Sequence, residues 1–180
     1  MNGPVLFTER LLLRRPMAED LDAWAAFDAD PVAMTHLGGV IERSVAWRQL
    51  CAMSGAWDIR GFAMFSVIER ATGKWVGRLG PWQPEGWPGT EVGWGVARAF
   101  EGTGYAYEAT VAAMDYAVDV LRWETVIHTI APDNVRSWKL AQRLGSYKMG
   151  PVTLPAPLQH EQVDAWGQTA AEWRANRSAR

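Results

Sequence analysis

The segment from Glu91 to Ala106 places an alternating run of residues directly before a glycine-rich turn and a helical pattern. Gly102 and Gly104 allow that turn to adopt positive φ and allow a ligand to come close to the backbone. The first amides of a helix lack intrahelical acceptors, and the helix dipole adds partial positive charge there. The pattern therefore predicts a phosphate or diphosphate site, with a tight structural turn as the other interpretation.

Two nucleotide-binding motifs can be compared with this turn. A P-loop requires Gly-x-x-x-x-Gly-Lys-Ser/Thr, and the sequence contains none. A dinucleotide site requires Gly-x-Gly-x-x-Gly, whereas the run that begins at Gly102 is Gly-Thr-Gly-Tyr-Ala-Tyr. The missing third glycine and the missing Lys-Ser/Thr disfavour a nucleotide-binding protein.

A second group of polar residues stands at the expected start of a later helix. Asn134 and Ser137 are three residues apart, which by spacing alone fits an N-cap asparagine and a first-turn serine. Lys139 and Arg143 follow on the same helix, where they either are solvated or meet the phosphates of a ligand. These residues become candidates for chemistry only if the helix begins beside the glycine turn.

Two titratable residues lie on expected strands. Glu91 begins a strand, so its carboxylate is either exposed at the strand end or acts as a general base whose pKa is raised by apolar neighbours. His128 lies mid-strand between Val126 and Ile130, which favours a packing histidine over a base.

Composition limits the remaining classes of function. The single cysteine excludes an internal disulfide and a cysteine-based zinc site, and three scattered histidines give no metal-site spacing, so we expect no metal. A net charge of -2 gives no reason to expect nucleic acid. The absence of an apolar run of roughly 20 residues predicts no membrane association, and a lone thiol fits a reducing cytoplasm.

The elements that must position these residues fit one domain over residues 1–180. Strands are expected at Phe7–Arg14, Phe62–Glu69, Trp75–Leu79, Thr90–Val96, Glu124–Ile130, Ser146–Gly150 and Gln162–Trp166. Helices are expected to begin at Pro16 and after Ser44, to span Tyr105–Leu121, and to run from Pro132 to Gly145. This order predicts a mixed sheet with helices on its faces.

Three local expectations follow from the same patterns. Ser44 is expected to cap the second helix, with Val45, Trp47, Leu50 and Cys51 facing inward. The loop Pro81–Gly89 carries Trp82, Glu85 and Trp87, which either hold a cationic amine, fold back onto the core or form a contact in a homodimer. The chain end with Arg174, Arg177 and Arg180 is expected to be a solvated tail.

The glycine turn also resembles a known family. The run Glu101-Gly-Thr-Gly-Tyr-Ala resembles the acyl-CoA loop of the GNAT acetyltransferase superfamily, Gln/Arg-x-x-Gly-x-Gly/Ala, in which Gly104 and Ala106 match and Glu101 departs. Further segments resemble the RimJ/RimL branch in order and spacing: Thr8–Arg14, Asp30-Pro31 with Met34–Gly39, Glu91–Val96, and Pro132–Ser137 with Leu144-Gly145.

The resemblance implies a fold and an activity. The implied fold is the α/β (α+β) GNAT fold, with a mixed, mostly antiparallel, twisted sheet of six to seven strands and helices on both faces. The implied activity is transfer of acetyl from acetyl-CoA to a primary amine by direct attack in a ternary complex. The acceptor would be a protein N-terminal α-amine or a small-molecule amine. A non-catalytic protein that binds or senses acyl-CoA is the alternative.

The resemblance also assigns roles to residues. It implies that Trp94, Gly95 and Val96 hold pantetheine on their free backbone groups. It implies that the diphosphate is held by the loop residues Glu101, Gly102, Thr103, Gly104, Tyr105 and Ala106. Asn134 would orient the cofactor, and Ser137 would donate a proton to the leaving thiolate. Glu91 would be the base.

Overall fold

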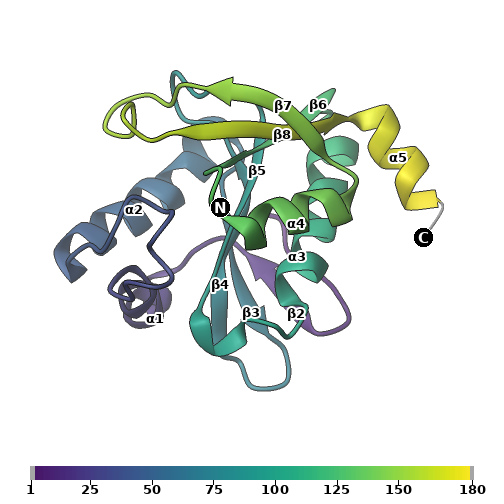
Figure 1. Ribbon diagram of the computed structural model, residues 1–180. Helices are drawn as coiled ribbons and strands as arrows, with labels where there is room; N and C mark the ends of the chain where they lie inside the picture. The colour runs from purple at the N-terminus through teal and green to yellow at the C-terminus, as the bar shows by residue number, and fades with distance from the viewer. Residues whose placement is uncertain (1–2, 179–180) are drawn as a thin grey trace.

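The computed structural model describes residues 3–178 and contains one eight-stranded sheet, with strand order β1-β2-β3-β4-β5-β6-β8-β7 (Figure 1). The strands are β1 Leu6–Phe7, β2 Leu11–Arg14, β3 Phe65–Glu69, β4 Trp75–Trp82, β5 Glu91–Val96, β6 Thr125–Ile130, β7 Tyr147–Val152 and β8 Val163–Thr169. The helices are α1 Leu21–Asp28, α2 Arg43–Arg60, α3 Tyr105–Asp115, α4 Val135–Leu144 and α5 Ala170–Ser178.

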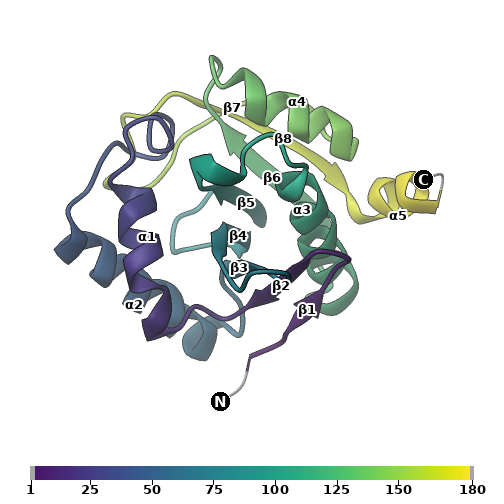
Figure 2. The same cartoon turned by 90° about the horizontal axis from the view of Figure 1, so that it is seen from below.

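All neighbouring strands are antiparallel except β5 and β6, which are parallel. The predicted mixed, mostly antiparallel α/β sheet is therefore confirmed. The sheet has eight strands rather than six to seven, because the segment predicted as one strand at Phe7–Arg14 folds into a hairpin that pairs Leu6 with Leu13. The N-terminal end of that hairpin forms one edge of the sheet (Figure 2).

Helices cover both faces of the sheet, as predicted (Figure 1). Side chains of successive strand residues point to opposite faces. A side chain added at Gly95 of β5 would meet Phe27 of α1, whereas the neighbouring Trp94 contacts Ser137 of α4. Helix α1 therefore lies on one face and α4 on the other, and β5 is the strand that both faces share.

Helix α2 begins at Arg43, two residues earlier than predicted. Glu42 is its N-cap, so Ser44 lies inside the first turn and does not cap it. Trp47 is 53% exposed and Cys51 is exposed, so the prediction that both face inward is wrong. The buried positions are Ala46, Leu50, Met53 and Trp57. Their spacing of three or four residues is the helical repeat, and it includes Leu50, which was predicted to face inward.

The C-terminal arginines do not form a solvated tail, because residues 170–178 form α5. Arg177 Nη1 lies 2.6 Å from Asp115 Oδ1 and 2.7 Å from Asp119 Oδ2, and Arg174 Nε lies 3.3 Å from Asp119 Oδ1. The same helix buries Trp173 completely. Arg180 lies outside the described residues.

The long helix predicted at Tyr105–Leu121 is present as α3 followed by a π-helical turn at Tyr116–Val120. Ala109, Ala113 and Ala117 are buried, and their small side chains let the helix lie close to β2, β4 and β5. None of the helices in residues 3–178 combines the length and apolar character that a membrane span requires.

Candidate active site

Strands β5 and β6 separate after a single registered pair, Glu91 opposite Ile127. The Ile127 amide donates to Thr90 O at 2.9 Å, and farther along β5 remains paired with β4 alone as far as Val96. The Ala97 amide donates to Val76 O on β4, and backbone groups alternate in direction along a strand. Those of Trp94 and Val96 therefore point away from β4, toward the gap. Those of Gly95 point toward β4, so the prediction that they are free is wrong. The gap thus presents strand edge groups suited to an extended ligand.

His128 of β6 contacts β5 at the point where the two strands separate. Its ring nitrogens lie 2.7 Å from Val92 O on β5 and 3.0 Å from Ser146 Oγ. Burial lowers the pKa of His128 to about 4, although its hydrogen bond to Val92 acts in the opposite direction. The imidazole is therefore neutral at physiological pH, with both nitrogens satisfied, which confirms the prediction of a packing histidine.

A cleft of about 980 Å³ opens at this gap. Its walls come from the α1–α2 connection, the end of β5, the glycine turn, the first turn of α3 and the start of α4. Most of the predicted site residues line it: Trp94, Gly95, Val96, Glu101, Gly102, Gly104, Tyr105, Ala106, Asn134 and Ser137. Two of them, Thr103 and Glu91, are not part of its lining.

The glycine turn has the predicted geometry. Gly102 has φ of 75° and Gly104, the N-cap of α3, has φ of 86°, conformations that other residues adopt at a cost. The first intrahelical bond runs from Glu108 N to Gly104 O, so the preceding amides lie at the open end of the helix. Thr103 stabilises the turn itself, since its hydroxyl donates to Phe100 O at 2.7 Å.

Glu101 forms an ion pair with Arg136 across the mouth of the cleft. The pair joins the glycine turn to α4, and both side chains are partly exposed. The acidic residue that departs from the family pattern therefore has its charge offset by a cation from the opposite wall.

Trp94, Asn134 and Ser137 form one hydrogen-bonded group. Asn134 is the N-cap of α4, as predicted, and its Oδ1 accepts from Ser137 N at 3.2 Å. Trp94 Nε1 donates to Ser137 Oγ at 3.1 Å. The serine hydroxyl is thereby fixed at the cleft wall next to the gap in the sheet.

Glu91 is buried rather than exposed at a strand end. Only 5% of its surface is accessible, and its Oε2 accepts from Trp87 Nε1 at 2.6 Å and from Thr129 Oγ1 at 2.9 Å. Burial raises the pKa of Glu91 to about 7, although both hydrogen bonds act to lower it. A carboxyl group with this pKa can exchange protons at neutral pH.

Glycines adjoin Glu91 on its own face of β5. A side chain added at Gly93 would come within 3.1 Å of Glu91 Oε1, and Gly95 on the same face lines the cleft. Ser137 contacts the opposite face of β5 through Trp94. Glu91, the candidate base, and Ser137, the candidate proton donor, therefore lie on opposite faces of the sheet beside the gap.

The Trp-rich loop differs from its prediction. Pro81 and Trp82 belong to β4, so the loop is shorter than Pro81–Gly89, and none of its residues lines the cleft. The Trp82 and Trp87 rings pack edge to face with centroids 6.3 Å apart. The loop's link to the site is the hydrogen bond from Trp87 to Glu91, and binding of an amine by its rings stays a prediction.

One wall of the cleft was not identified from the sequence. It consists of Val32, Ala33, Thr35, His36 and Leu37, in the segment between α1 and α2. Asp30 shapes this segment by accepting from the Val32 amide at 2.8 Å, so the Asp30-Pro31 break was its sequence signal. His36 Nδ1 lies 3.6 Å from Asp133 Oδ1 on the opposite wall. Among residues 3–178, no cluster of three or more His, Cys, Asp or Glu side chains could hold a metal.

Comparison with known proteins decides the family. Residues 10–146 match the family model described as "Acetyltransferase (GNAT) domain". The chain belongs to the GNAT acetyltransferase family. This membership identifies it as an acyltransferase, and the glycine turn, the gap in the sheet and the start of α4 all lie within the matched residues.

Individual relatives agree with this assignment. The chain is 29% identical over 148 residues to the uncharacterized N-acetyltransferase p20 of Bacillus licheniformis, covering 81% of this chain and 83% of that protein. An acetyltransferase from Agrobacterium tumefaciens has a TM-score of 0.81 at 28% identity, with 93% and 95% of the two chains covered. A spermidine N-acetyltransferase from Vibrio cholerae, in complex with CoA and spermine, shares the fold at TM-score 0.74 and 14% identity, with 93% and 99% covered.

Proposed function

We propose that this GNAT protein transfers acetyl from acetyl-CoA to a primary amine by direct attack within a ternary complex. One observation carries the proposal: a single cleft joins the glycine turn at the start of α3, the open edge of β5 and the hydroxyl of Ser137. The glycine turn suits a diphosphate, the open strand edge suits an extended arm that carries amides, and the hydroxyl lies where a thioester would follow.

The residues present fit acetyl-CoA. Amides at residues 102–106 suit the diphosphate, because a helix N-terminus favours anions, although the Tyr105 amide already donates to Thr103 Oγ1 at 3.4 Å. The edge groups of Trp94 and Val96 suit the two amides of pantetheine, which can bind as an added strand does. The proposal is supported by the spermidine N-acetyltransferase of the same fold, which was solved in complex with CoA.

The chemistry requires two proton transfers. The amine loses a proton as its nitrogen attacks the thioester carbonyl, the C–N bond forms, and the C–S bond breaks with release of a thiolate. In this proposal Glu91 receives the amine proton, through water because the carboxylate does not line the cleft, and Ser137 donates a proton to the thiolate. Edge amides of β5 would stabilise the oxyanion, and Asn134 would hold Ser137 and the cofactor in place.

The acceptor is proposed by class. We place the chain in the RimJ/RimL-like branch, on the motifs at Thr8–Arg14 and Pro132–Ser137, which favours a protein N-terminal α-amine. A small-molecule amine is the second candidate. We further propose that residues 1–180 form a single domain that acts in the cytoplasm. Any homodimer contact would involve Trp82 at the end of β4 and the following loop, which carries Trp87.

Two measurements test the function. Calorimetry with acetyl-CoA, CoA and ATP should give binding of the first two ligands and none of ATP. Thiol release should then be measured across protein N-terminal peptides, polyamines, amino acids and aminoglycosides. Turnover with one class identifies the acceptor. CoA binding without turnover on any amine would favour an acyl-CoA sensor, and lack of CoA binding would contradict the proposal altogether.

A further inference from the structure

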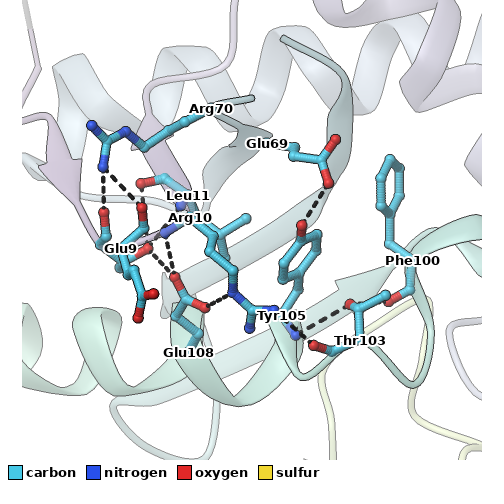
Figure 3. Close-up of polar contacts among 10 residues, drawn as sticks. Glu9, Arg10, Leu11, Glu69, Arg70, Phe100, Thr103, Tyr105 and Glu108 are labelled. Atoms are coloured by element: carbon cyan, nitrogen blue, oxygen red, sulfur yellow. Dashed lines mark hydrogen bonds and ion pairs between the residues drawn. The ribbon is translucent and has the colours of Figure 1, made fainter. Parts of the chain in front are cut away.

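The N-terminal motif Thr8–Arg14 contacts the glycine turn, although it lies some ninety residues earlier in the chain (Figure 3). Arg10 donates through Nε to Glu108 Oε2 at 2.7 Å and through Nη1 to Thr103 O at 3.0 Å. Its guanidinium also lies over the Tyr105 ring, 4.5 Å from the centroid. One side chain therefore contacts the turn and the first helical turn of α3 at three residues.

Glu108 is the anchor of this contact. Its carboxylate accepts from Thr8 Oγ1 at 2.5 Å, from Arg10 N at 2.9 Å and from Arg10 Nε at 2.7 Å. Burial alone would raise the pKa of Glu108, but these hydrogen bonds lower it overall, so the carboxylate stays charged. Because the charges of Arg10 and Glu108 offset each other, the pair acts on the turn by geometry more than by its field.

The bond from Arg10 to Thr103 O determines where the next amide points. In a planar trans peptide the C=O and the following N–H point in opposite directions. Holding the Thr103 carbonyl toward β2 therefore directs the Gly104 N–H the other way, and Gly104 lines the cleft. A side chain at Gly104 would approach Arg10 Nη2 to 3.4 Å, so the guanidinium lies directly behind this residue.

We propose that Arg10, held by Glu108, is a positioning residue that fixes the amides of the glycine turn for the diphosphate of the acyl donor. The proposal rests on the proposed function. It requires the fork of a guanidinium, since an ammonium group at the same place cannot reach Glu108 and Thr103 O together with the same geometry.

The test compares R10Q, R10K and E108Q with R70Q as the matched control. Arg70 supports the same hairpin, but its hydrogen bonds go to Thr8 O and Glu9 O rather than to the glycine turn (Figure 3). We expect R10Q and R10K to raise the Kd for CoA on the order of tenfold, with kcat at saturating acetyl-CoA and the acceptor KM little changed. E108Q should show a smaller loss, and R70Q should match the wild type.

A donor without a diphosphate separates positioning from a general structural defect. S-acetylpantetheine carries the thioester but no diphosphate, so R10Q should leave its kcat/KM unchanged. Unchanged CoA affinity in R10Q, wild-type affinity in R10K, or equal losses on both donors would overturn the inference. If circular dichroism shows that R10Q is unfolded, the CoA affinities of R10K and E108Q test the inference instead. Wild-type protein that fails to bind CoA would instead refute the proposed function, and this inference with it.

Discussion

The indole N–H of Trp94 donates to Ser137 Oγ at 3.1 Å, across the junction between β5 and α4. An indole nitrogen can only donate, so the serine oxygen is the acceptor and the hydroxyl proton remains available for another partner. This polarity is what a proton donor to a leaving thiolate requires.

Replacing Ser137 by Ala should therefore lower kcat while leaving CoA binding nearly intact. Loss of a general acid reduces rates by roughly 10²- to 10⁴-fold at most, and water substitutes for part of that, so we expect a fall of about 10- to 100-fold. Steady-state thiol release and calorimetry with CoA measure the two quantities. An undiminished kcat would remove Ser137 from the mechanism.

The pH dependence of the rate should report Glu91. A base must be deprotonated, so log kcat/KM should rise with pH below about 7, the pKa that burial gives this carboxyl, and level off above it. E91Q should lower the rate on the order of 100-fold and flatten the profile. The exposed Glu85 offers a matched control, because E85Q should retain the wild-type profile. A profile identical in E91Q and wild type would assign the base elsewhere.

Trp87 should tune that pKa. Its hydrogen bond to Glu91 favours the charged carboxylate, so W87F should raise the Glu91 pKa further and move the midpoint of the rate profile to higher pH, by up to about one unit. W82F changes the neighbouring ring without removing that bond and should leave the midpoint in place. A shift to lower pH in W87F would contradict this account. A raised acceptor KM in either variant would support amine binding by the loop.

The Glu101–Arg136 ion pair predicts opposite effects from its two members. E101Q leaves Arg136 unpaired at the cleft mouth and should lower the KM for acetyl-CoA, whereas R136Q leaves Glu101 facing the phosphates and should raise it. Both side chains are partly exposed, so changes of about two- to fivefold are expected, and they should shrink as salt is added. Changes of the same sign would show that the pair acts on loop structure instead.

Trp173 should be essential for stability. It is fully buried and donates to Asp115 Oδ1 at 2.9 Å, so W173A should reduce the free energy of unfolding by about 3–5 kcal/mol. Chemical denaturation measures this loss. W173F restores most of the apolar contact but not the hydrogen bond, and it should recover much of the stability. A loss below about 1 kcal/mol in W173A would mean that α5 is dispensable.

The part of the site that depends on local sequence was predictable. Glycines at 102 and 104 followed by a helical pattern specify the turn, and Asn134 specifies the start of α4. The mid-strand position of His128 among apolar residues was also sufficient to predict packing. In each case neighbours along the chain are sufficient to predict that the turn, cap or packing position exists, whereas the contact of Arg10 with the glycine turn could not be predicted from them.

The remainder depends on contacts between distant residues. The burial of Glu91 requires Trp87 and Thr129 to close over it, and the order of α5 requires Asp115 and Asp119 to meet its arginines. For α2, tertiary packing rather than local pattern selects the buried face: Trp47 and Cys51 were predicted inward, but each follows a buried residue and so lies about 100° around the helix from it.

The separation of β5 from β6 divides the molecule into two halves. Strands β1 to β5 form one continuous antiparallel group and β6, β8 and β7 form another, joined by a single registered pair. The chain passes between the groups once, through residues 97–124, which include the glycine turn and α3. The segment that would hold the donor's diphosphate is thus also the covalent bridge between the halves. A donor bound along the gap would therefore contact both halves of the sheet, and its bound length and width would set the distance between them.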